Sequence, residues 1–210
     1  MIGLLLKDFY TLKQYGKTML FLVALFTFVS AFQDNPVPFF EGFIIMASMM
    51  MAITSFGYDT VAKWDRYALS LPVTRAEVVA SKYLLSLILC FGGAAVSFLI
   101  STVVLRFRPA EDFSTTTHLY IIAGLVGAAI FLSGITLPLT FKFGTEKSRI
   151  ILAGVFALPT AAVIVLSKAG LPMIPATALT VIAKLLPFLL ILFYLLSYLL
   201  SVKIFTAKEI

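Results

Sequence analysis

Long apolar runs alternate with short polar breaks along the whole chain. Six of the runs approach the roughly 20 residues that a helix needs to cross a bilayer, and they cover residues 17–32, 38–56, 82–105, 119–141, 150–167 and 184–202. The breaks carry charged residues, proline or glycine, as in QDNPVP and RFRPAEDFSTTTH. The pattern predicts an all-α integral membrane protein with six transmembrane helices. The proline-containing stretch 169–183 is predicted to be a bent or re-entrant outer segment.

Residues 1–16 predict an amphipathic helix that lies in the membrane interface. Apolar residues recur there at helical spacing, and polar ones lie away from that stripe. The apolar stripe is Ile2, Leu5, Leu6, Phe9 and Leu12, and the polar side is Lys7, Thr11 and Gln14. An irregular tail is the alternative.

The most polar part of the chain is the loop 57–81, between the second and third predicted spans. We expect a helix over 57–71, with Asp59 and Lys63 four residues apart and able to pair. Pro72 should end this helix, because the residue before a proline avoids helical geometry. Thr74 and Glu77 then form a capping box that starts the third span. The alternative is a solvated loop helix that only rests on lipid.

Composition and charge support a membrane protein and set its orientation. The chain is 61% hydrophobic and 12% charged, whereas a soluble domain has about a quarter of its residues charged. With six spans, twelve of the sixteen Lys and Arg residues fall on the side of both termini, so both termini are predicted to be cytoplasmic. This basic excess is a topology signal, so nucleic-acid binding gains no support from it. The single cysteine, Cys90, excludes an intramolecular disulfide.

Few side chains suggest chemistry. The chain has no G-x-x-x-x-G-K-[ST] loop, no H-E-x-x-H and no G-x-S-x-G, so we expect no catalytic, cofactor or metal site. His118 is the single histidine, and we expect a plain interfacial residue. Glu41 lies in an apolar stretch, where a carboxylate is costly unless it faces protein or water. We expect it to reach outward to the interface, with a role on a cargo surface as the alternative.

The second span is rich in methionine, which suits irregular apolar surfaces. Met46, Met49 and Met50 are therefore candidates for a cargo surface, and core filling is the simpler interpretation. Small residues in the third and fourth spans are expected to pack helices within the subunit. These small residues are Gly92, Gly93, Ala94, Ala95, Ala123, Gly127 and Ala128.

Two stretches resemble a known family. YDTVAKWDRYALSLPVTRAEVVASKYL and LPLTFKFGTEKSRI are similar to two patterns of ABC-2-type transporter permeases, in the same order and on the same predicted side. The chain resembles small six-span bacterial exporter permeases linked to peptide-toxin export, including phenol-soluble modulins, and to lantibiotic immunity. Together the two stretches cover about forty residues.

The resemblance implies one part of a larger machine in the bacterial plasma membrane. Such permeases pair as homodimers or related heterodimers, and each binds a separate ATPase subunit, which holds the ATP and Mg²⁺. The loop between the second and third spans would carry a coupling helix that docks on the ATPase. By this resemblance the coupling residues would be Asp59, Lys63, Trp64, Arg66 and Tyr67, with Lys142, Glu146, Lys147 and Arg149 as a second contact.

The implied function is ATP-driven export of amphiphilic cargo, with cytolytic or antimicrobial peptides as the favoured class. Drug or lipid export stays open. A free-standing channel or carrier is a competing class, although it usually needs ionisable groups or broken helices near the bilayer centre. A membrane anchor for a cytoplasmic enzyme is a third.

Overall fold

The computed structural model describes residues 2–30, 32, 36–68, 70, 72–107, 115–168 and 176–208. All regular secondary structure within these ranges is helical, which confirms the predicted fold class. The helices are α1 (Ile2–Lys13), α2 (Gly16–Ser30), α3 (Pro36–Val61), α4 (Trp64–Ala68), α5 (Arg75–Phe107), α6 (Thr115–Lys168) and α7 (Ala176–Ala207).

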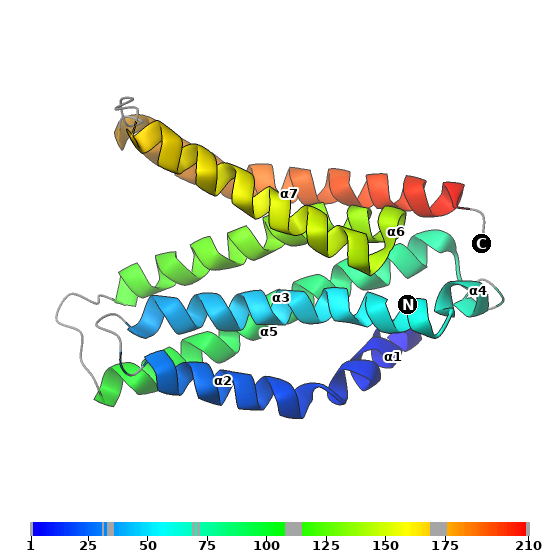
Figure 1. Ribbon diagram of the computed structural model, residues 1–210, viewed down its shortest axis with the longest axis horizontal. Coiled ribbons are helices and arrows are strands. Elements are labelled where there is room, and N and C mark those ends of the chain that lie inside the picture. The colour runs from blue at the N-terminus through cyan, green and yellow to red at the C-terminus, as the bar shows by residue number, and fades with distance from the viewer. Residues whose placement is uncertain are drawn as a thin grey trace.

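The long helix α6 consists of two limbs that meet at Gly144. This glycine has φ 81° and ψ 175°, a backbone conformation that side chains with a Cβ rarely adopt. Figure 1 shows that the chain turns back on itself at this point. The predicted spans 119–141 and 150–167 therefore fall on separate, oppositely directed limbs.

Among the described residues, four helical stretches are long and apolar enough to cross a membrane, namely Phe39–Val61, Arg75–Arg106, Thr116–Ser148 and Leu185–Ala207. The apolar stretch Gly16–Val29 in α2 is shorter. The fifth predicted span lies in the second limb of α6, where most side chains are outside the described part of the chain. The count of six spans therefore stays a prediction, and the predicted outer segment 169–183 lies partly outside the described residues.

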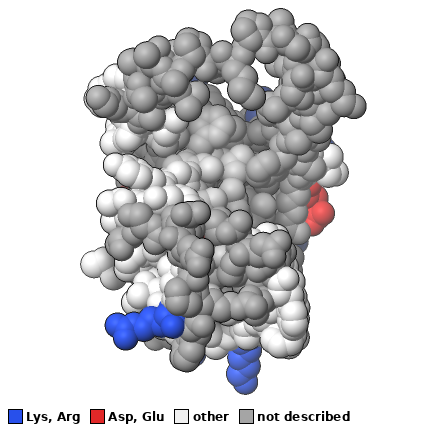
Figure 2. Space-filling model, turned by 90° about the vertical axis from the view of Figure 1, so that its left-hand side faces the viewer, with Lys and Arg blue, Asp and Glu red and all other residues white. Residues whose placement is uncertain are grey.

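Both chain ends lie at one end of the helical bundle. Figure 1 shows α1, α4, the start of α5 and the end of α7 together at this end, which we call the terminal end. The starts of α3, α6 and α7 lie at the opposite end. Figure 2 looks onto that opposite end, and its described surface is largely uncharged, with isolated basic and acidic side chains at the edges of the view.

Helix α3 is central, and it packs against α2, α5 and α6. At the terminal end the core joins α1, α3, α5, α6 and α7 through residues such as Leu4, Phe56, Val79, Leu137 and Phe205. A second cluster, which includes Ile45, Met49 and Cys90, fills the space between α3, α5 and α6. Since α3 touches both clusters, it connects the terminal end with the opposite end.

The close approach of α3 and α5 depends on Gly93. A Cβ at this position would lie 2.7 Å from the Cβ of Ser48, so a larger residue would force the two helices apart. This agrees with the predicted packing role of the small residues. Gly92, by contrast, is exposed and faces open space.

Helix α1 is amphipathic in a different way from the prediction. The buried side carries Leu4, Asp8 and Leu12, and the exposed side carries Ile2, Leu6 and Phe9. The expected single apolar stripe is therefore divided, because a buried aspartate takes part in the contact of α1 with the bundle. The apolar side chains of Ile2, Leu6 and Phe9 are exposed on the surface of the protein.

Candidate functional site

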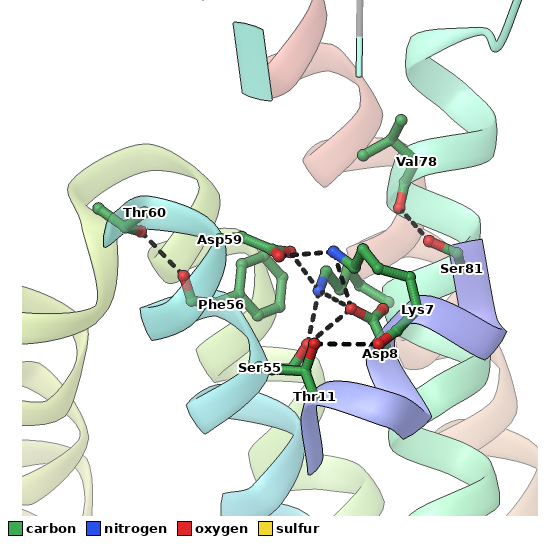
Figure 3. A network of polar contacts seen from close by, with 10 residues as sticks. Lys7, Asp8, Thr11, Ser55, Phe56, Asp59, Thr60, Val78 and Ser81 are labelled. Carbon is green, nitrogen blue, oxygen red and sulfur yellow. Dashed lines mark hydrogen bonds and ion pairs between the residues drawn. The ribbon is translucent and has the colours of Figure 1, made fainter. Parts of the chain in front are cut away.

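A buried cluster of charges joins three helices at the terminal end (Figure 3). Lys82 on α5 lies 2.8 Å from Asp8 on α1 and 2.5 Å from Asp59 on α3. Lys7 on α1 lies 2.5 Å from the same Asp59 and 3.0 Å from Asp8. Ser55 accepts a hydrogen bond from Lys82 and donates one to Asp8. We call these five residues the inner cluster.

The inner cluster is electrically balanced, because two lysines face two aspartates. Asp8, Ser55, Asp59 and Lys82 are buried, and the Lys7 side chain is about one quarter exposed. Burying one charge without a partner is costly, and removal of one member of a buried ion pair typically destabilises a protein by about 3–5 kcal/mol. The cluster therefore fixes α1 to α3 and α5 in one arrangement.

Asp59 differs from its predicted role. It was expected on the exposed coupling surface and paired with Lys63, but its carboxylate points into the bundle and pairs with Lys7 and Lys82. The reason is that α3 runs as far as Val61, so Asp59 belongs to the end of a spanning helix. Lys63 lies in a turn with φ 50°, beyond the end of α3 at Val61, so it is not one helical turn from Asp59 on the same helix.

The predicted helix over 57–71 is divided into two. Helix α3 ends at Val61, the chain turns at 62–63, and the short helix α4 covers Trp64–Ala68. Within α4, Ala68 is fully buried, Trp64 is partly buried and Tyr67 is 58% exposed. The side chain of Arg66 is outside the described residues. Helix α4 therefore presents Tyr67 outward while Ala68 holds it to the bundle.

Trp64 connects α4 to the inner cluster. The Lys7 ammonium lies 4.3 Å from the centroid of the Trp64 ring, which is a cation–π contact. The Trp64 ring also lies 5.2 Å from the Tyr67 ring. A displacement of α4 would therefore act on Lys7, and through it on the ion pairs of α1, α3 and α5.

The start of α5 follows the predicted capping box. The Thr74 backbone N–H donates to the Glu77 carboxylate at 2.8 Å, and the Glu77 N–H donates to the Thr74 hydroxyl at 3.2 Å. Next to it, the Arg75 guanidinium donates to the backbone carbonyls of Phe205 at 3.1 Å and Thr206 at 2.6 Å. Arg75 therefore satisfies carbonyls at the end of α7, where a positive charge is favourable.

The second family-like stretch forms the turn of α6, also at the terminal end. Lys142, Glu146 and Lys147 around this turn are all exposed. Thr140 donates a hydrogen bond to Ser148 across the turn at 3.1 Å, and Ser148 donates one to the Gly144 carbonyl at 2.7 Å. The side chain of Arg149 is outside the described residues. The turn is thus internally bonded and presents charged side chains outward.

Towards the opposite end, the structure brings Glu41 and His118 together. Their side chains are hydrogen-bonded between Glu41 Oε1 and His118 Nε2, and the Ser101 hydroxyl lies 2.9 Å from the same nitrogen. The Phe98 ring stacks on the imidazole with a centroid distance of 5.1 Å. All of these groups except Phe98 are buried. We call Glu41, Ser101 and His118 the outer cluster.

Two expectations about the outer cluster were wrong. Glu41 does not reach outward to the interface, because its side chain is completely buried. His118 is not a plain interfacial residue, because it is 3% exposed and paired with that carboxylate. The two residues are 77 positions apart, so no local pattern indicated the pair. The available sequence signal was that both are isolated ionisable residues, which the predicted topology places near the same outer side of the membrane.

The methionines of α3 fall into two environments. Met49 is buried in the core with Ile45 and Cys90. Met46 and Met50 instead line an open apolar groove of about 410 Å³ between α2 and α3. Only these two of the four predicted cargo residues reach an open surface, since Glu41 is also buried.

No group of three or more His, Cys, Asp or Glu side chains within the described residues is arranged to hold a metal ion. The two clusters are instead ion pairs and hydrogen bonds within the protein. Their arrangement can hold helices together and can pass a displacement from one helix to another.

Apolar helices long enough to span a bilayer, joined by buried ion pairs, define a multi-pass membrane protein. The chain belongs to the ABC-2 family: the model of that family, described as ABC-2 family transporter protein, matches residues 3–206. It is therefore the membrane component, or permease, of an ABC transporter, a type of subunit that works with an ABC ATPase. Comparison with curated proteins and with solved structures found no match.

Proposed function

We propose that this permease is an exporter subunit that moves amphiphilic cargo out of a bacterial cell, with cytolytic or antimicrobial peptides as the cargo class. A separate ATPase binds ATP and Mg²⁺ and supplies the energy. Two permease copies, identical or related, form the membrane pathway. The family membership and the similarity of two cytoplasmic stretches to small peptide-exporter permeases support this assignment.

In this proposal the ATPase docks at the terminal end. Helix α4 lies within the first family-like stretch, and the turn of α6 lies within the second. Both are at the terminal end (Figure 1), and both carry exposed side chains. The residues available for contact are Tyr67, Lys142, Glu146 and Lys147, together with the exposed Lys63. The observation that carries the proposal is the Trp64–Lys7 contact, because it links the docking helix α4 to ion pairs that join three helices. Asp59 and Trp64 would act as transmitting residues within the bundle.

The terminal end then faces the cytoplasm. The excess of Lys and Arg on that side of the predicted topology supports this orientation. It places both chain ends and the ATPase on one side of the plasma membrane. The outer cluster would lie near the extracellular side.

For the cargo we propose the groove lined by Met46 and Met50. Its walls are almost entirely apolar, and methionine side chains adapt to variable shapes. A surface of this kind suits amphipathic peptides that share little sequence. Drugs or lipids are the alternative cargo class, and stimulation of ATP hydrolysis by an amphipathic peptide distinguishes the two.

The ATPase partner is to be sought in the neighbouring reading frame and co-expressed with a tagged permease. Replacing Tyr67 by Ala removes an exposed aromatic residue of the kind that dominates interfaces, where truncation often costs 2 kcal/mol or more. We expect at least roughly a 30-fold loss of affinity for the ATPase in co-purification. The matched control is Tyr120→Ala, because Tyr120 is 79% exposed and lies towards the opposite end.

The control variant should bind the ATPase as the unchanged protein does. Both variants should reach the membrane in normal yield, since neither tyrosine is buried. Equal ATPase binding by all three proteins would contradict docking through α4.

A further inference from the structure

A second pocket lies between α1 and the bundle, beside the proposed cargo groove, with which it shares Leu12 and Met51. It has a volume of about 390 Å³ and is lined from α1 by Leu6, Phe9, Tyr10, Leu12 and Lys13. Met51 of α3 and Leu89 of α5 complete its lining. The walls are apolar apart from the ends of Tyr10 and Lys13, and the pocket is open on one side.

The open side of the pocket lies on the exposed side of α1. Leu6, Phe9, Tyr10 and Lys13 are spaced three, one and three residues apart, so they share one face of the helix. Leu6, Phe9 and Tyr10 are 53%, 40% and 65% exposed. A helix with such a face lies at the level of the lipid head groups, where tyrosine is enriched and lysine extends its ammonium to the polar layer.

The charge around this pocket is uncompensated. The acid on α1, Asp8, is paired with Lys82 and Lys7, and Asp59 is paired with the same two lysines. Lys13 lines the pocket and is exposed, and the exposed Lys17 follows it across the bend between α1 and α2. Within the described part of the chain no ion pair involves either of these two lysines. An apolar pocket with uncompensated positive charge at its rim is complementary to an anionic amphiphile.

We propose that this pocket binds one anionic phospholipid molecule. One acyl chain lies against Phe9, Met51 and Leu89, and the phosphate lies at Lys13 with Lys17 nearby. A cationic amphiphile would meet like charge at the rim, and a free phosphate would leave the apolar walls without a partner. The lipid holds α1 against α3 and α5 from the side opposite to the inner cluster. The site does not depend on which cargo the transporter carries.

The test uses the purified full-length permease, reconstituted with equimolar phosphatidylglycerol and phosphatidylcholine of identical acyl chains. After extraction into mild detergent, native mass spectrometry counts the lipid that stays bound. We expect one retained phosphatidylglycerol per chain and a clear preference over phosphatidylcholine. Replacing Lys13 by Gln should lower that preference about fivefold, as expected for one basic residue near an anionic surface.

Two further variants distinguish binding of the acyl chain from binding of the head group. Met51→Trp fills the pocket and should reduce retention of both lipids while Lys13 is intact. Lys203→Gln is the matched control, since Lys203 is an exposed lysine near the end of α7, and it should leave retention unchanged. These measurements involve neither the ATPase nor transport, so their outcome is independent of the exporter proposal.

Several results would overturn the lipid site. These are equal retention of both lipids, a Lys13→Gln protein that keeps its preference, or a Met51→Trp protein that keeps its bound lipid. Displacement of phosphatidylglycerol by inorganic phosphate alone would assign the site to a free anion. An efficient disulfide between two copies of a Phe9→Cys variant would show that a second permease covers the pocket, and would also overturn the proposal.

Discussion

Both buried clusters hold ionisable side chains inside the helical bundle, but they provide these side chains with different partners. The inner cluster uses two lysines and two aspartates from three helices, and it contacts α4 through Trp64. The outer cluster uses one glutamate and one histidine, with Ser101 beside them. Each carboxylate and each ammonium of the inner cluster has two charged partners, so the loss of one side chain leaves the others unbalanced. The outer cluster joins only one carboxyl group to one imidazole.

This difference suggests different roles. The inner cluster lies where an ATPase would act, and its many partners make it sensitive to the position of each helix. The outer cluster joins α3, α5 and α6. We therefore expect the inner cluster to transmit force and the outer cluster to hold the opposite end together.

The largest expected effect is the labelling of two introduced cysteines from opposite sides of the membrane. Cysteines placed at Lys147 and Tyr120 should react with an impermeant thiol reagent from opposite sides, the first only from the cytoplasm and the second only from outside. The native Cys90 is buried and should stay unlabelled. Labelling of both introduced cysteines from the same side would remove the basis for calling the clusters inner and outer.

Replacing Lys82 by Met should destabilise the protein most. It leaves two buried aspartates with only Lys7, and the expected loss is about 3–5 kcal/mol of unfolding free energy. A second change, Asp8→Asn, removes the excess negative charge, so the double variant should recover part of the loss. Thermal unfolding in detergent measures both effects. Additive losses would show that the two residues do not interact as the ion pair requires.

Replacing His118 by Phe should cost less, roughly 1–3 kcal/mol, which is typical of a buried polar group left without its partner. The change removes the partner of one buried carboxyl group, whereas Lys82→Met removes a partner of two. Adding Glu41→Gln to His118→Phe should change stability little. The same unfolding measurement applies, and a loss larger than that of Lys82→Met would reverse the comparison between the clusters.

Whether a structural feature could be predicted from the sequence depended on how far apart its residues lie along the chain. The capping box of Thr74 and Glu77 was predicted and confirmed, because its parts are three residues apart and the signal is local. The helical fold class followed from apolar runs in the same way. Both buried clusters were missed, because their members are brought together only by packing of helices: Lys7 is 52 residues from Asp59, and Asp8 is 74 residues from Lys82.

The break between α3 and α4 was missed for another reason. Residues 58–68 contain no glycine or proline, and Val61, Trp64 and Ala68 are spaced three and four residues apart, as on one face of a continuous helix. Lys63 nevertheless adopts φ 50°, a backbone conformation that is uncommon for lysine and that its residue type does not predict. The contacts of Ala68 and Trp64 with the bundle are what hold α4 in its place, and these contacts are tertiary.

Gly93→Ala tests the helix pair that both clusters share. The added methyl group would meet Ser48, and such overpacking costs about 1 kcal/mol or more. The position lies between the two clusters on α5, so the separation of α3 from α5 should weaken both. Gly92→Ala is the neighbouring control, because it faces open space and should be neutral or slightly stabilising. Equal melting temperatures for the two variants would contradict close packing at Gly93.

Site-specific cross-linking to the ATPase tests the central claim most directly. Cysteines are placed singly at Tyr67 in α4, at Lys147 beside the α6 turn and, as a control, at Tyr120, each in a permease co-expressed with its ATPase. Our account predicts cross-links to the ATPase from the first two positions and none from the third. Cross-links from position 120, or none from positions 67 and 147 in a complex that still hydrolyses ATP, would contradict docking at the terminal end.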